Sequence, residues 1–353
     1  MQEYLYNLAT DRINGIIPSV LKFFFLLFSF FYELVVRSII FLYKVRIFKK
    51  HYLECKVISV GNITLGGTGK TPLVETIAKR LAEKGVKVAI LTRGYKRELS
   101  KEGKSDEASM LSEHLSGVPV LVGRDRIKNA RKAIQDHNTE VILLDDGFQQ
   151  WRIHKDLEIV TIDSTNPFGN RKLIPRGILR EPLSSLRRVD VIVATKTDFG
   201  SDNLVKIKFL SEQINSRSLL VETVHHPLSL IRAGNKEEVN VSGLMNRNVC
   251  LLASIGDPIT FENTVLKLGL KPTLRFYFQD HYQYKQDDIK KIIRVCSENK
   301  INTIITTEKD VPRINEFNPS FAEGISLLAL RIGIKFTKNE KTFFERLSSV
   351  CNC

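Results

Sequence analysis

A glycine-rich stretch with a lysine and a threonine is the first part of the chain whose residue types could do chemistry. It reads GNITLGGTGKTP, follows a short β-branched run at residues 56–60, and precedes the amphipathic run LVETIAKRLAEKG. Strand, glycine loop and helix in this order predict a P-loop, whose backbone amides and helix N-terminus bind phosphate oxygens. We expect Lys70 to reach the terminal phosphates of a nucleoside triphosphate and the Thr71 hydroxyl to ligate Mg²⁺.

The glycine spacing departs from the strict pattern at one place. G-x-x-x-x-G-K-S/T requires glycine at position 64, which is Thr64 in this chain. A glycine-rich turn can be merely structural, but Gly-Lys-Thr after a strand favours nucleotide binding. The residues predicted to form the phosphate loop are Thr64, Gly66, Gly67, Thr68, Gly69, Lys70 and Thr71.

Two adjacent aspartates end a later apolar run. In VILLDDGFQQ, four apolar residues lead directly into Asp145 and Asp146. Two carboxylates at the end of a buried strand repel each other, so they require a cation or another partner. Because this arrangement is typical of Mg²⁺ binding opposite a P-loop, we expect both aspartates to serve the metal.

Polar residues in other stretches are weaker candidates for the functional site. Arg93 and Tyr95 lie just beyond the strand predicted by VKVAILT, where α/β proteins gather their sites. Asp106 lies in a polar loop that could simply be solvated. The irregular stretch at residues 163–188 suits an anionic substrate or a transferred phosphate, with a basic solvated loop as the equal alternative. Its basic residues include Arg171, Lys172, Arg176, Arg180, Arg187 and Arg188.

Alternating strand and helix patterns predict the elements that must position these residues. They indicate an α/β fold of P-loop NTPase type, with a largely parallel sheet and helices on both faces. The chain becomes polar after Asp198, and a second α/β pattern follows. We therefore expect a membrane-associated helix in residues 1–50, a P-loop domain in 51–215 and a smaller α/β C-terminal domain in 216–353.

An apolar run at residues 16–48 is predicted to contact a membrane. Its longest uncharged stretch, between Lys22 and Glu33, is too short to span a bilayer. On a helix these two charges lie with Arg37 and Lys44 on one narrow stripe, which favours a helix in the membrane interface. A buried core helix is the alternative.

Charge and composition narrow the possible partners. The 353 residues carry a net charge of +14, which attracts an anionic lipid surface, a phosphorylated substrate or nucleic acid. We expect no nucleic-acid partner, because the sequence has no recognition helix, zinc finger or aromatic strand motif. The 5 cysteines lack zinc-type spacing and are expected to be free thiols. Without a cleavable signal pattern, the body of the protein is expected in the cytoplasm.

A series of short motifs resembles the tetraacyldisaccharide 4'-kinase family over nearly the whole chain. In order they are GGTGKTP, TRGY, SDE, LDDGFQ, LREPLSSL, FQDHY and TTEKD. The resemblance implies Mg²⁺-dependent transfer of the γ-phosphate of ATP to the 4'-hydroxyl of a tetraacyl glucosamine disaccharide 1-phosphate. The product would be lipid IVA, the bis-phosphorylated lipid A precursor of lipopolysaccharide synthesis. The implied location is the cytoplasmic face of the inner membrane, as a peripheral protein or with a single N-terminal anchor, and no obligate protein partner is expected.

The resemblance also implies roles for individual residues, in a site between the P-loop kinase domain and the C-terminal domain. Asp106 would be the catalytic base, His281 would orient or assist it, and Lys70 would act on the phosphates. Such roles suit phosphoryl transfer, which depends on positioning and charge neutralisation. The residues implied to line the substrate and phosphate site are Arg93, Tyr95, Gln149, Arg180 and Glu181.

The main alternative is a membrane-associated P-loop GTPase or ATPase switch. ATKTD at residues 194–198 is similar to the guanine-reading N-K-x-D motif, with Thr195 in place of Asn. Against a GTPase, no D-x-x-G follows the acidic strand. Against a partition-type ATPase, Leu65 occupies the position where that class carries a second lysine. Glu308, Lys309 and Asp310 are assigned no chemistry.

Overall fold

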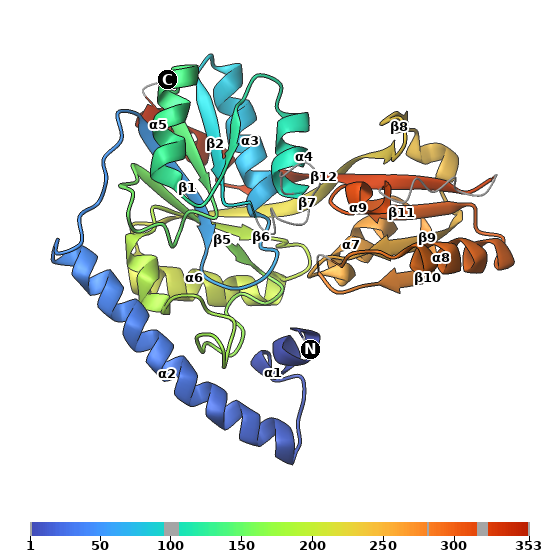
Figure 1. Cartoon of the computed structure of the whole chain (residues 1–353), viewed down its shortest axis with the longest axis horizontal. Coiled ribbons are helices and arrows are strands. Elements are labelled where there is room, and N and C mark those ends of the chain that lie inside the picture. The colour runs from blue at the N-terminus through green and yellow to red at the C-terminus, as the bar shows by residue number, and fades with distance from the viewer. Residues whose placement is uncertain (1, 95–105, 281, 316–323, 352–353) are drawn as a thin grey trace. The chain divides into compact units, whose positions relative to one another are not determined.

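The structure is a computed structural model that describes residues 2–94, 106–280, 282–315 and 324–351 (Figure 1). The chain divides into two compact units. Unit 1 comprises Met1–Val224 and Phe336–Cys353, and unit 2 comprises His225–Lys335.

Unit 1 is built on a parallel sheet with the strand order β3-β2-β4-β1-β5-β6-β7. Nearly all residues of its central strands are buried, as expected for parallel strands covered on both faces. The strand bounds are β1 Lys56–Asn62, β2 Val88–Thr92, β3 Val120–Val122, β4 Val141–Asp145, β5 Leu157–Asp163, β6 Val191–Thr195 and β7 Leu219–Arg232. The predicted P-loop NTPase-type architecture is confirmed.

Helices pack against this sheet and begin near the ends of its strands. α3 packs against β1, β2 and β4, while α5 packs against β2 and β3. The helix bounds in unit 1 are α1 Gln2–Ala9, α2 Ile16–Lys44, α3 Lys70–Glu83, α4 Asp106–His114, α5 Arg126–His137, α6 Ser201–Asn215 and α10 Glu340–Cys351, with the 3₁₀ turn η2 at Leu183–Arg188. The prediction that Asp106 lies in a polar loop is wrong, because Asp106 is the first residue of α4. Acidic residues in a first helical turn are stabilised by the helix dipole.

α2 is one long continuous helix (Figure 1). Of its 29 residues, only Ser29 and Val36 are buried. The uncharged stretch between Lys22 and Glu33 is too short to span a bilayer, but the whole helix is long and apolar enough to cross one by length and composition. Its mean hydropathy is 2.0 over a window that is 11% buried. Such slight burial contradicts the alternative of a buried core helix. Two of its charged residues pair with each other, since Arg37 lies 2.6 Å from Glu33.

In unit 2 the strands β10, β9, β11 and β12 run parallel in that order, and β8 pairs antiparallel with the last part of β7. The strand bounds are β8 Glu238–Val239, β9 Asn248–Ala253, β10 Lys271–Tyr277, β11 Thr303–Thr307 and β12 Ser326–Lys338. The helices are η3 Val241–Leu244, α7 Pro258–Lys267, α8 Gln286–Glu298 and α9 Val311–Asn315.

The division into units differs from the expected boundary near Ser216. It falls within β7 after Val224, because residues 219–222 of this strand pair with β6. The C-terminal residues 336–353, which the sequence assigned to the second domain, belong to unit 1. There the guanidinium of Arg80 lies 5.3 Å from the ring of Phe344, and Lys84 donates to Ser348.

Candidate active site

The loop between β1 and α3 has the backbone conformation that its glycines allow. Gly66 has a φ of 108° and Gly69 a φ of 78°, both in the region that side chains rarely adopt. Gly69 is the N-cap of α3, so Lys70 and Thr71 lie in the first helical turn. Amides in this turn lack helical partners and, with the helix dipole, favour an anion.

Side chains from neighbouring strands hold the loop in place. The Thr68 and Thr161 hydroxyls lie 2.7 Å apart, and the Thr195 hydroxyl donates to the Thr68 carbonyl at 3.1 Å. Asn62 Nδ2 donates to the Thr64 carbonyl at 2.8 Å. β1, β5 and β6 supply these contacts, and the Thr68 amide donates to the Gly66 carbonyl at 3.1 Å within the loop itself. The sheet therefore helps to hold the loop in place.

Asp146 lies opposite the P-loop and is surrounded by positive charge. Its carboxylate lies 3.7 Å from Lys70 Nζ and accepts two hydrogen bonds from the guanidinium of Arg180, at 2.7 and 3.2 Å. Burial raises the pKa of Asp146, but Lys70 and Arg180 outweigh it and lower this pKa below the ordinary value. Asp146 is therefore ionised at neutral pH.

The pKa of the adjacent residue, Asp145, is shifted in the opposite direction. Its side chain is buried at the end of β4, and its Oδ1 has no hydrogen-bond partner among the described residues. Burial raises its pKa, Lys70 opposes this, and the negative charges of Asp146 and Glu107 add to it. The influence of Glu107 means that the first turn of α4 lies near the acidic pair.

Arg126 is a further charged residue of this site that the sequence analysis missed. It is only 3% exposed, and its Nη2 donates to the Asp145 carbonyl at 3.1 Å. Burial lowers its pKa to about 10, and its Nε and Nη1 have no partner in the described part of the chain. The available signal was its place as first residue of α5, directly after the N-cap Asp125.

Three of the predicted substrate-lining residues have described side chains near β1 or β2. Arg93 is exposed just beyond β2, and Gln149 donates to the Asn62 carbonyl at 3.2 Å. Arg180 Nη1 also donates to Asn62 Oδ1 at 2.9 Å, in addition to binding Asp146. The structure therefore brings Gln149 and Arg180 together at the end of β1.

Glu181 does not have the placement expected of a substrate-lining residue. It is fully buried, and both of its carboxylate oxygens accept hydrogen bonds from Arg188 at 2.8 Å. Arg188 in turn lies 3.8 Å from the ring of Phe148 and donates to the Phe148 carbonyl. Glu181 thus holds Arg188 against the segment that follows the acidic pair.

Three predicted site residues lie wholly or partly outside the described residues. Asp106 is the first residue of α4, but its side chain is outside the described part of the chain. Tyr95 and His281 lie outside it entirely.

Comparisons with known proteins show the family to which this chain belongs. The family described as LpxK, tetraacyldisaccharide-1-P 4'-kinase, matches residues 21–352. The chain belongs to this family. It is 35% identical to a tetraacyldisaccharide 4'-kinase of Halothermothrix orenii, covering 89% of this chain and 88% of the relative, and 33% identical to one of Syntrophus aciditrophicus, covering 91% and 90%. A crystal structure of LpxK from Aquifex aeolicus in complex with ATP superposes with a TM-score of 0.72 at 27% identity, covering 94% of this chain and 99% of that chain.

Family membership makes this chain a phosphotransferase with an alcohol acceptor, and the GTPase alternative gains nothing from the structure. The Thr195 hydroxyl, at the position of the guanine-reading Asn, donates to Thr68. Lys196 is 2% exposed and lies 2.5 Å from Asp163. The side chains of Thr195 and Lys196 therefore both bind other residues of this chain.

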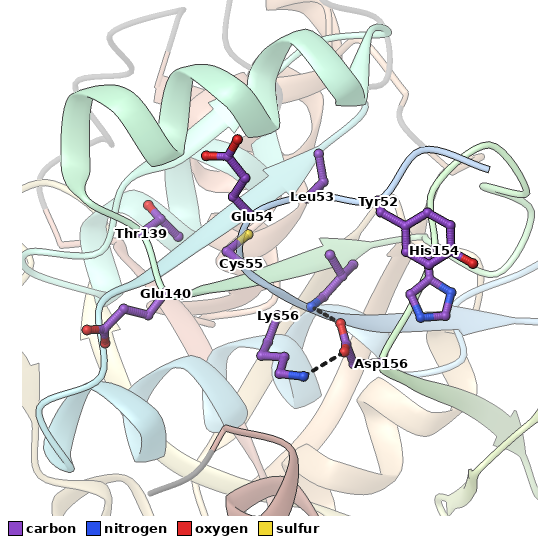
Figure 2. A pocket seen from close by; sticks show the side chains of 10 residues that line it. Tyr52, Leu53, Glu54, Cys55, Lys56, Thr139, Glu140, His154 and Asp156 are labelled. Carbon is purple, nitrogen blue, oxygen red and sulfur yellow. Dashed lines mark hydrogen bonds and ion pairs between the residues drawn. The ribbon is translucent and has the colours of Figure 1, made fainter. Parts of the chain in front are cut away.

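A hollow at the opposite end of the sheet contains none of the predicted site residues. It has a volume of about 590 Å³ and lies where β1 and β5 begin (Figure 2). Within it Lys56 and Asp156 form an ion pair at 3.0 Å, and the rings of Tyr52 and His154 stack.

Proposed function

We propose that this 4'-kinase family member transfers the γ-phosphate of ATP to the 4'-hydroxyl of a tetraacyldisaccharide 1-phosphate, giving lipid IVA. The observation that carries this proposal is the position of Lys70, in the first turn of α3 and 3.7 Å from Asp146. A P-loop lysine in that position reaches the terminal phosphates of a bound nucleotide. The residues proposed to surround the triphosphate are Thr64, Gly66, Gly67, Thr68, Gly69, Lys70 and Thr71.

Mg²⁺ fits the oxygen atoms available beside this loop. Thr71 offers a hydroxyl, Asp146 an ionised carboxylate, and Asp145 an oxygen with no hydrogen-bond partner among the described residues. Mg²⁺ prefers such hard oxygen ligands, with the phosphates and water completing the set. When bound, the ion neutralises charge that develops on the phosphates.

Asp106 is proposed to accept the proton of the attacking hydroxyl, with His281 orienting or assisting it. The 4'-hydroxyl loses its proton to the Asp106 carboxylate, and its oxygen bonds to the γ-phosphorus. The bond between that phosphorus and the bridging oxygen breaks, so ADP leaves. Lys70 and Arg180 supply positive charge near the transferred group, where positioning and electrostatics dominate catalysis.

The acceptor is proposed to be reached from the cytoplasmic face of the inner membrane. α2 exposes many large apolar side chains, among them Phe23, Phe28, Phe30 and Phe31 at 59 to 65%. An apolar helix of this kind can be buried in a lipid surface. The proposed substrate-lining residues are Arg93, Tyr95, Gln149 and Arg180.

The proposal is tested by phosphate transfer from labelled ATP to detergent-dispersed tetraacyldisaccharide 1-phosphate. Parallel reactions contain labelled GTP or lack the acceptor, and the products are separated by chromatography. We expect label in the lipid with ATP. Phosphate released without the acceptor, and none in the lipid, would overturn the kinase proposal in favour of a nucleotide-hydrolysing switch.

A further inference from the structure

α2 turns two hydroxyl groups toward the body of unit 1. Ser29 is only 5% exposed, and its hydroxyl donates to the Leu173 carbonyl at 2.8 Å. One turn along the helix, the Tyr32 hydroxyl donates to the Arg180 carbonyl at 2.9 Å. Tyr32 also packs against the buried cluster that contains Leu173 and Leu179. The otherwise apolar helix therefore holds two main-chain positions of one loop.

That loop, residues 173–180, is closed by its own backbone and is here called the brace loop. Its ends are joined by a hydrogen bond from the Ile174 amide to the Leu179 carbonyl at 2.9 Å. The Gly177 amide donates to the Leu173 carbonyl at 2.9 Å, and a Cβ at Gly177 would lie 2.1 Å from the Lys172 carbonyl. Because the loop is closed and tightly packed, its two anchored ends move together.

The brace loop also pairs with the first residues of the P-loop. The Leu65 amide donates to the Ile178 carbonyl, and the Arg180 amide donates to the Ile63 carbonyl, both at 2.7 Å. The guanidinium of Arg180 then binds Asp146 and Asn62. A continuous series of hydrogen bonds thus runs from α2 through the brace loop to the P-loop and the acidic pair.

We propose that Ser29 and Tyr32 are positioning residues, through which the membrane-facing helix fixes the start of the P-loop and the guanidinium of Arg180. The apolar face of α2 contacts lipid while its two hydroxyls hold the brace loop. The inference rests on the proposed function only in taking the P-loop as the ATP site. Removal of the Tyr32 hydroxyl takes away the hydrogen bond that it donates to the Arg180 carbonyl, whereas removal of the Ser29 hydroxyl leaves the Leu173 carbonyl with the Gly177 amide as a donor. We expect either change to loosen the pairing at residues 63–65, and the change at Tyr32 to have the larger effect.

Amide hydrogen exchange of the full-length protein tests this proposal without any catalytic assay. In Tyr32→Phe, we expect exchange about fivefold faster at the amides of Leu65 and Arg180, the ratio that about 1 kcal/mol produces. The amides of β2 should exchange as in the wild type. The matched control is Tyr43→Phe on the same helix, because the Tyr43 ring contacts Phe48 and Trp151 while its hydroxyl has no hydrogen bond within the described residues. Unchanged exchange at Leu65 and Arg180, or equal acceleration throughout unit 1, would overturn the proposal.

ATP binding in a double-mutant cycle separates positioning from general support. We expect Tyr32→Phe to weaken ATP binding about fivefold in the wild-type background, but less than about twofold when Arg180→Ala is already present. The same loss in both backgrounds would show that Tyr32 does not act through Arg180. Because neither experiment uses the lipid acceptor, a failure of lipid phosphorylation would count against the proposed function and leave this inference standing.

Discussion

The two ends of the parallel strands in unit 1 both carry charged residues, but they use them differently. At the carboxyl end, Asp145 Oδ1 and two nitrogens of Arg126 are buried with no partner among the described residues. At the amino end, Asp156 accepts hydrogen bonds from Lys56 and from the Val57 amide (Figure 2). The hollow at the amino end therefore lies beside an ion pair formed within the chain, while Asp145 Oδ1 and the two Arg126 nitrogens lie near the glycine loop with no hydrogen-bond partner among the described residues.

The direction of the strands explains this difference. In parallel α/β sheets the helices begin at the carboxyl ends of strands, so their N-termini and unpaired amides gather there. α3 and α5 both begin at that end, where the helix dipoles favour phosphate. A buried polar group without a partner is costly, so its retention points to a ligand that satisfies it. The size of a hollow carries no such information.

The largest expected effect compares one lysine from each end. Lys70→Ala should lower phosphate transfer by about 10³-fold, because it removes the positive charge nearest the terminal phosphates. Lys56→Ala, at the amino end, should leave the rate within about twofold. Initial rates with labelled ATP and the dispersed lipid check both variants. Similar losses would mean that the two ends do not differ in the way described.

Asp106→Ala sharpens the comparison within the carboxyl end. We expect a loss of turnover of about 10² to 10⁴-fold, the usual contribution of a general base, with ATP affinity within about twofold of the wild type. Calorimetric titration with ATP measures the affinity separately from the rate. If Asp106→Ala lost as much ATP affinity as Lys70→Ala, its proposed action on the acceptor hydroxyl would be wrong.

Much of unit 1 could be predicted from the sequence, because its strands and its glycine loop are marked by patterns of neighbouring residues. The strand before Asp145 and Asp146 is a continuous apolar run, and the glycine-rich loop that ends in Gly-Lys-Thr follows another strand. Contacts between distant residues were not predictable in this way. The family resemblance implied that Glu181 lines the substrate site, but the 3₁₀ turn η2 brings Arg188 to its carboxylate, a contact that the sequence did not reveal.

Arg126 and α10 illustrate the same limit. An arginine at the start of a basic helix resembles a solvated residue in the sequence, and only the fold buries Arg126 beside Asp145. Residues 336–353 belong to unit 1, where they pack against α3. No local sequence pattern predicts this packing. The resemblance to a family supplied roles for Asp106 and His281 that periodicity and charge alone did not.

Glu181→Gln tests a charge that is satisfied by the chain. Removing this charge leaves Arg188 without its buried partner, and we expect a loss of about 2 to 3 kcal/mol in the free energy of unfolding. Urea denaturation measures this loss. The matched control is Glu298→Gln, whose carboxylate forms an exposed pair with Arg294 and should contribute less than about 0.5 kcal/mol. A fully stable Glu181→Gln protein with weakened substrate binding would restore the expected substrate-lining role.

The smallest expected effect is the contribution of Asp11 to the free energy of unfolding. Like Glu181, this carboxylate has hydrogen-bond partners within the chain. Burial raises the pKa of Asp11, but hydrogen bonds from Arg176, Asn170 and Lys22 outweigh it and lower this pKa to about 2. An unfolded aspartate has a pKa of about 3.9, so the ionised form stabilises the folded state above about pH 4. That contribution is lost as the pH falls toward about 2. The pKa of Asp145, which has an unpaired oxygen, is instead raised.

The shift of Asp11 alone would correspond to about 2.5 kcal/mol. The side chain is 39% exposed, so solvent screening reduces the expected contribution to about 1 kcal/mol. We expect Asp11→Asn to lower the free energy of unfolding by this amount at pH 6 and by less than half of it near pH 3, measured by urea denaturation. A difference that did not change with pH would show that Asp11 contributes through shape rather than charge. The contrast between paired and unpaired carboxylates would then have to rest on Glu181 and Asp156.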